Sequence, residues 1–108
     1  MSMSVMLCLC ACPDEASAAA IAKALVQERL AACVNRLPAV RSTYRWQGRV
    51  EEAEEVLLLI KTTKDRLDDL IGRVQALHPY ELPELIAVEA EGGLAPYLTW
   101  VDEQTRES

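Results

Sequence analysis

Residues 40–62 read VRSTYRWQGRVEEAEEVLLLIKT, and this segment is the strongest indication of the fold. In its first half polar and apolar side chains alternate, so Tyr44 and Trp46 lie on one face of a predicted strand. The Gln47–Gly48 pair supplies a turn, after which the chain returns. Residues 55–62 are almost continuously apolar, which is typical of a strand buried on both faces. A long hairpin that leads into a central strand favours an antiparallel sheet.

The segments before this hairpin supply a strand, a helix and a short strand. The apolar run at residues 4–12 predicts a buried strand. Residues 15–31 predict an alanine-rich helix with an acidic first turn. Residues 33–37 predict another strand, which Pro38 interrupts.

The segments after the hairpin alternate helix, strand and helix. We expect Thr63 to cap a helix, whose apolar positions recur at helical spacing: Leu67, Leu70, Ile71, Val74 and Leu77. Residues 85–88 predict a fourth strand, which Gly92–Gly93 ends. A short last helix follows, marked by Leu94, Tyr97, Leu98 and Val101.

This element order is the split βαβ pattern of an α+β, ferredoxin-like fold, βαββαβ plus a C-terminal helix. Its helices cover one face of the sheet and leave the other bare. Residues 56–60 and 85–88 are nonetheless apolar on both sides, so another copy of the chain is the simplest cover. Tyr44 and Trp46 on the long hairpin are either anchors of such an interface or fold back on their own core.

The bulk composition limits the class of protein. With 108 residues and 12.0 kDa, residues 1–108 are expected to form a single domain. The net charge of −6 argues against nucleic-acid binding and against binding to an anionic membrane surface. No run is long enough to span a membrane, and no basic residue precedes the apolar N-terminal run, so we interpret that run as a strand. The alternate cysteines Cys8, Cys10 and Cys12 fit a reduced, cytoplasmic protein better than a disulfide framework.

The segment His78-Pro79-Tyr80-Glu81-Leu82-Pro83-Glu84 holds the only histidine. Each proline disfavours helix at the residue before it, so His78 and Leu82 are expected to be extended. A stiff, acidic connector with an aromatic side chain suggests that a group is held in place there.

Five motifs occur in order along the chain: Ala31-Ala32-Cys33-Val34-Asn35, Ser42-Thr43-Tyr44-Arg45-Trp46-Gln47-Gly48, Ile60-Lys61-Thr62, the segment from His78 to Glu84, and Tyr97-Leu98-Thr99-Trp100. Together they resemble the CutA divalent-cation tolerance family. The resemblance covers about residues 5–101. It implies a homotrimer similar in architecture to PII signalling proteins, with a role in tolerance of divalent metal ions and no enzymatic activity.

The resemblance also implies metal ligands and interface residues. The positions that match copper-binding members are Cys10, Cys33 and His78, which would meet within a subunit or across a subunit boundary to hold copper or zinc. Cys12 either adds a ligand or fills space. The alternatives remain that the cysteines are plain core residues and that His78 caps a helix end. Glu81 and Glu84 are either metal or acid–base groups or line a cleft between subunits, together with the expected interface residues Tyr44, Trp46, Tyr80 and Trp100.

Three functions follow for comparison. The first is a trimeric metal-binding protein of cation tolerance. The second is a PII-like signalling module that binds a small ligand between subunits, although no glycine-rich phosphate loop is present. The third is a thiol enzyme or hydrolase with a Cys–His pair, which lacks a recognisable oxyanion-hole motif.

Overall fold

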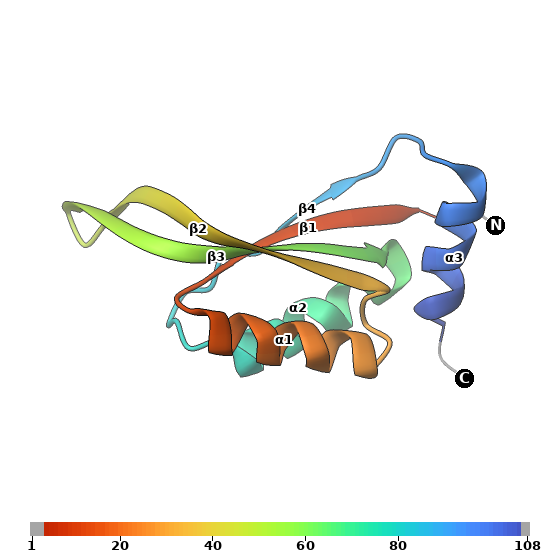
Figure 1. Cartoon of the computed structure of the whole chain (residues 1–108), viewed down its shortest axis with the longest axis horizontal. Coiled ribbons are helices and arrows are strands. Elements are labelled where there is room, and N and C mark those ends of the chain that lie inside the picture. Colours follow the sequence, from red (N-terminus) through yellow and green to blue (C-terminus); the bar gives the residue numbers. More distant parts are fainter. Residues whose placement is uncertain (1–3, 107–108) are drawn as a thin grey trace.

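The computed structural model describes residues 4–106 as one antiparallel sheet with helices (Figure 1). The strands are β1 (Val5–Cys12), β2 (Cys33–Trp46), β3 (Arg49–Thr63) and β4 (Ile86–Glu89). The helices are α1 (Glu15–Gln27), α2 (Leu67–Leu77) and α3 (Ala95–Gln104), with a 3-10 turn η1 (Lys64–Arg66) before α2. The strand order is β2-β3-β1-β4. This order confirms the predicted α+β, ferredoxin-like arrangement.

The hydrophobic core lies between the sheet and the helix pair α1 and α2, which cover one face of the sheet (Figure 1). Cys8, Cys10 and Cys12 all point into this core and have no exposed surface. They share a face because successive side chains of a strand alternate between the two sides. The predicted common face of the three cysteines is therefore correct, and it is the helix-covered face.

Helix α1 ends four residues earlier than the predicted boundary at residue 31. Arg29 takes a left-handed backbone conformation with φ of 59°. The Leu30 N–H then donates to the Leu25 carbonyl at 2.9 Å, and the Arg29 N–H donates to the Val26 carbonyl at 3.2 Å. These two bonds form a Schellman motif, which usually has glycine at the left-handed position. Because the residue at this position is arginine and not glycine, the sequence gives no signal that the helix ends here.

Strand β2 continues through Pro38 where the sequence predicts an interruption. The ladder with β3 shifts register between Leu37 and Val40, and Ala39 has φ of 61°. Since β2 is an edge strand, Pro38 fits in this bulge without removing an interior ladder bond. Residues 40–55, here called the ribbon, therefore continue the same hairpin beyond the body of the sheet (Figure 1).

Gln47 and Gly48 form the predicted turn of the ribbon. Both have positive φ, at 51° and 79°. A two-residue loop with this backbone matches the right-handed twist of the strands that it joins.

Two predicted details of the second half are shifted. Thr63 stands before η1 but makes no side-chain capping bond, so the expected cap is wrong. Its hydroxyl instead lies 3.4 Å from that of Thr105. Strand β4 begins at Ile86, one residue later than predicted. Helix α3 packs at the end of the sheet, where its Val101 is buried against Val5 and Ala32.

The sheet face opposite α1 and α2, here called the open face, carries exposed apolar side chains. Val88 pairs with Leu7 and Ile86 pairs with Leu9, so these side chains alternate away from the cysteine face. Ile86 is 58% exposed and Val88 is 56% exposed. The predicted bare face is therefore present in the chain, and its cover by other copies stays a prediction.

Candidate metal centre and adjoining cleft

His78 directly follows α2, where Pro79 prevents the helix from continuing. Its backbone is extended, as predicted, with φ of −74° and ψ of 137°. The imidazole is almost fully buried and has a partner on each nitrogen. Nδ1 accepts from the Tyr80 N–H at 3.1 Å, and Nε2 lies 2.8 Å from the Ala11 carbonyl oxygen. Because a carbonyl only accepts, these contacts assign the proton to Nε2 and make the ring neutral.

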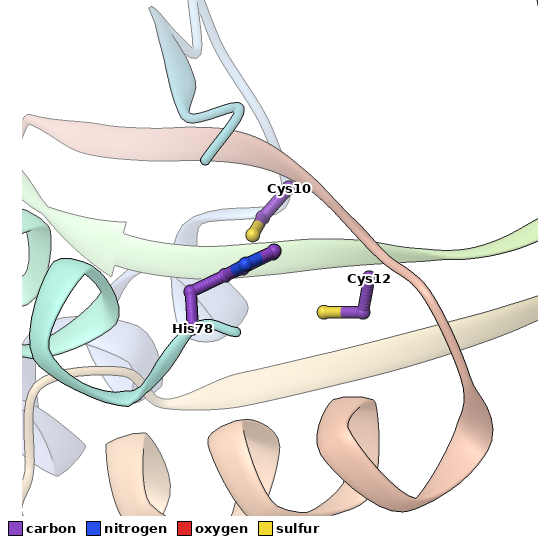
Figure 2. Close-up of side chains that lie close together, drawn as sticks. All are labelled: Cys10, Cys12 and His78. Atoms are coloured by element: carbon purple, nitrogen blue, oxygen red, sulfur yellow. The ribbon is translucent and has the colours of Figure 1, made fainter. Parts of the chain in front are cut away.

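The buried imidazole lies beside two cysteines of β1. One ligand atom each from Cys10, Cys12 and His78 lie within 4.8 Å of one another, and all three residues are buried. Figure 2 shows the Cys10 thiol next to the ring and the Cys12 thiol on the same side of β1. In residues 4–106 this is the one group of three histidine, cysteine or acidic side chains close enough to share an ion.

The two thiols of this cluster differ in acidity. A hydrogen bond with Cys12, followed by burial, raises the pKa of Cys10. The same hydrogen bond lowers the pKa of Cys12, because the Cys10 S–H donates to the Cys12 thiolate. Cys12 is therefore the first of the pair to lose its proton, and thiolate is the form that binds metal.

The donor set fits a thiophilic metal ion. Two thiolates and an imidazole are the ligands that zinc and reduced copper prefer. Two thiolates that share a tetrahedral zinc ion lie about 3.8 Å apart. The ligand atoms of the cluster lie within 4.8 Å of one another, so the two sulfur atoms would have to approach by at most about 1 Å. His78 would have to release one ring hydrogen bond to offer a lone pair. A small side-chain movement would then complete a three-ligand site.

Cys33 does not join this cluster within one chain. It pairs with Lys61, which in turn pairs with Leu7, and this row belongs to the open face. Cys10 belongs to the opposite, helix-covered face. The structure thus brings together Cys10 and His78 from the predicted set, adds Cys12, and leaves Cys33 on the other side of the sheet.

A cleft adjoins the cluster at the base of the ribbon. Its volume is about 370 Å³, and its lining residues are Ala11, Tyr44, Trp46, Glu55, Tyr80, Glu81, Leu82 and Glu84. Four of the five residues predicted to lie at an interface or cleft therefore meet here. Tyr44 is 41% exposed and Trp46 is 40% exposed, so neither is buried in its own core. Whether they contact another copy stays a prediction.

A buried carboxylate anchors one wall of the cleft. The Tyr80 hydroxyl donates to Glu55 Oε2 at 2.7 Å, and Glu55 is only 6% exposed. Burial, followed by this bond to the carboxylate, raises the pKa of Tyr80 above its usual range. Tyr80 thus stays a neutral donor and fixes the direction of the Glu55 side chain.

Comparison with known proteins matches residues 6–104 to the family model described as CutA1 divalent ion tolerance protein. The chain belongs to this CutA1 family. The divalent-cation tolerance protein CutA of Thermus thermophilus is 54% identical over 93 residues, covering 86% of this chain and 90% of the relative. Protein CutA of mouse is 46% identical over 102 residues, covering 94% of this chain but 58% of the relative.

The CutA1 fold is also evident from solved structures. The crystal structure of CutA from Xylella fastidiosa superposes with a TM-score of 0.92 at 52% identity, covering 94% of this chain and 98% of that chain. The family that the sequence motifs resemble is therefore confirmed. Within residues 4–106, no helix has the length and apolar character needed to cross a membrane.

Sequence patterns predict the positions of three residues of this CutA1 family member only in part or not at all. Trp100, expected at a subunit interface or cleft, lines a separate hollow with Arg29 and Gln104, and its place at an interface stays a prediction. Glu55 is a cleft residue that is not predicted from the sequence, although a carboxylate at the start of an apolar strand is an available signal. Cys12 is the third member of the cluster, and its alternate spacing from Cys10 is the signal for it.

Proposed function

We propose that this CutA1 family member serves divalent-cation tolerance by binding reduced copper, or zinc, through Cys10, Cys12 and His78. The observation that carries the proposal is that one ligand atom of each lies within 4.8 Å of the others, in buried positions. Burial excludes water from the bound ion. Soft thiolate ligands then favour copper or zinc over metal ions that keep their bound water, such as Mg²⁺. The proposed role is binding, in keeping with family names that describe tolerance.

The order of events follows from the thiols. Cys12 ionises first because Cys10 donates a hydrogen bond to it. An ion bound to Cys12 then favours loss of the Cys10 proton, since a coordinated thiol is held as thiolate. His78 would complete the set when Nδ1 gives up the hydrogen bond from the Tyr80 N–H and offers its lone pair, or when Nε2 loses its proton together with its bond to the Ala11 carbonyl. Uptake should therefore release protons and weaken at low pH.

The test is metal uptake by single variants under anaerobic, reducing conditions. Competition against a coloured chelator gives the affinities of the parent, Cys10→Ala, Cys12→Ala and His78→Gln for Cu(I) and Zn²⁺. We expect a loss of at least tenfold for each. Cys8→Ala is the matched control, because Cys8 lies on the same face of β1 but outside the cluster.

The variant Cys33→Ala separates the two ligand sets. The cluster predicts that it leaves affinity unchanged, whereas the set implied by family resemblance predicts a loss equal to that of His78→Gln. Unchanged affinity in Cys10→Ala and Cys12→Ala would contradict the proposed site.

We also propose that the protein is a cytoplasmic homotrimer. The support is the open face, whose apolar side chains include Ile86 and Val88 on β4. The four cysteines are free thiols, as in a reducing compartment. Light scattering should give three times the chain mass for the parent and a lower mass for Val88→Lys. Val26→Lys on the helical side is the control, since Val26 is 43% exposed on α1.

A second candidate function is a PII-like module that binds a small ligand. The cleft of about 370 Å³ at the base of the ribbon favours it, because clefts of this size suit small molecules. A saturable response to a small ligand that depends on cleft residues and not on the metal cluster would support this function.

A further inference from the structure

The cleft at the base of the ribbon combines two kinds of side chain. Tyr44, Trp46 and Tyr80 give it aromatic walls, and Glu55, Glu81 and Glu84 give it three carboxyl groups. Among residues 4–106, no lysine or arginine lines the cleft, so these carboxylates have no cationic partner there within the described part of the chain. Such a cleft is complementary to positive charge.

The cleft does not suit a bare metal ion. Among residues 4–106, the three cleft carboxylates are not close enough together to share one ion, whereas Cys10, Cys12 and His78 are. Charge spread around a space of about 370 Å³ matches a larger cation with several hydrogen-bond donors. The aromatic walls add attraction for such a cation, because the face of an aromatic ring carries negative potential.

We propose that this cleft binds a small organic cation, with a guanidinium or ammonium group between the aromatic rings of Tyr44 and Trp46 and the carboxylates of Glu81 and Glu84. The proposal specifies the ligand class of the second candidate function and rests on it. None of the residues proposed to bind the ligand belongs to the metal cluster.

Glu55 has a different part in the cleft from the other two carboxylates. Its buried carboxylate is already held by the Tyr80 hydroxyl at 2.7 Å. Glu81 and Glu84 are exposed and have no such anchor in the connector. Glu55 and Tyr80 therefore shape the wall, and Glu81 and Glu84 supply the charge that pairs with the ligand.

Two probes of similar shape and different charge test the ligand class. n-Butylguanidinium is a cation at neutral pH, and n-butylurea is its neutral counterpart. The protein has two tryptophans, so a Trp100→Phe background leaves Trp46 as the only tryptophan to report from the cleft. Titration with the cation, in metal-free NaCl buffer at constant ionic strength, should give a saturable change in Trp46 fluorescence. We expect half-saturation at a cation concentration of about 1 mM. n-Butylurea should give none.

Paired charge removal tests the residues. Glu81→Gln/Glu84→Gln should weaken n-butylguanidinium binding at least tenfold. The control Glu91→Gln/Glu103→Gln removes the same net charge from exposed positions outside the cleft and should leave the affinity unchanged. Light scattering on all variants should show the parent mass.

Four results would overturn the proposal. The first is no fluorescence response of the parent to n-butylguanidinium, and the second is an equal response to n-butylurea. The third is equal weakening of n-butylguanidinium binding by the two double variants. The fourth is loss of assembly in Glu81→Gln/Glu84→Gln while the parent shows no ligand response. ATP serves as an anionic probe. A saturable response to ATP and none to n-butylguanidinium would reject the cation class while leaving the ligand-binding function standing.

Discussion

The Tyr80 hydroxyl donates a 2.7 Å hydrogen bond to Glu55 Oε2, although 25 residues separate the two in sequence. This bond joins the connector after α2 to the base of the ribbon on β3. The bond closes one side of the cleft. Tyr80 follows His78 by two residues, and the centres of the two rings are 4.9 Å apart. The metal cluster and the cleft therefore share one structural support.

Tyr80→Phe should destabilise the protein by about 1–3 kcal/mol, because Glu55 would remain buried without its donor. Urea unfolding at a fixed protein concentration measures the change. The control Tyr97→Phe removes a hydroxyl from a tyrosine that is 39% exposed on α3 and should change stability by less than about 0.5 kcal/mol. Equal effects of the two substitutions would show that the bond to Glu55 contributes nothing.

Thr62→Val should destabilise the protein by about 1–3 kcal/mol while keeping the side-chain shape. Thr62 has no exposed surface, and its hydroxyl donates to the Leu30 carbonyl at 2.7 Å. This bond fastens the chain after α1 to the end of β3. The same substitution at Thr43, on the exposed part of the ribbon, is the control and should be nearly neutral. A neutral Thr62→Val in urea unfolding would contradict this role.

Stability should fall as pH rises from 9 to 11, in part because of Cys8. Burial raises the pKa of the Cys8 thiol from its ordinary 9.0 to about 11. In this range the unfolded chain releases the proton and the folded chain keeps it, so high pH favours unfolding. Below pH 9 both states hold the proton, and the contribution of this group to stability is fully present.

The variant Cys8→Ala should therefore show a shallower loss of unfolding free energy between pH 9 and 11 than the parent. Ile60→Val is the control, because Ile60 pairs with Cys8 in the sheet but does not titrate. It should lower stability by about 1 kcal/mol at every pH and keep the parent slope. Parallel slopes for Cys8→Ala and the parent would count against the raised pKa.

Ala39→Gly should stabilise the protein by up to about 1 kcal/mol. Ala39 lies in the bulge of β2 with φ of 61°, where a Cβ atom is unfavourable and glycine is not. Ala53→Gly is the matched control on β3, opposite Ser42, and should destabilise by about 0.5–1 kcal/mol. Thermal unfolding of the two variants should move the midpoint in opposite directions, and shifts of the same sign would argue against backbone strain at Ala39.

Much of the fold follows from local sequence patterns. The alternation in residues 40–46 and the apolar run in residues 55–62 predict the ribbon and the central strand, because strand side chains alternate with a fixed period. The largest boundary errors, at the end of α1 and within β2, depend on unusual backbone. Arg29 ends α1 in a conformation that usually needs glycine, and Pro38 is accepted because β2 is an edge strand. Neither fact is visible in a window of the sequence.

The site is less predictable than the fold. Local sequence is enough to predict that Cys8, Cys10 and Cys12 share a strand face and that His78 ends a helix in an extended conformation, because these properties depend on neighbouring residues alone. The folded chain brings His78 to Cys10 and Cys12, places Cys33 on the opposite face of the sheet, and lets Tyr80 reach Glu55. Those contacts depend on strand order and register, which arise from packing between segments far apart in the chain.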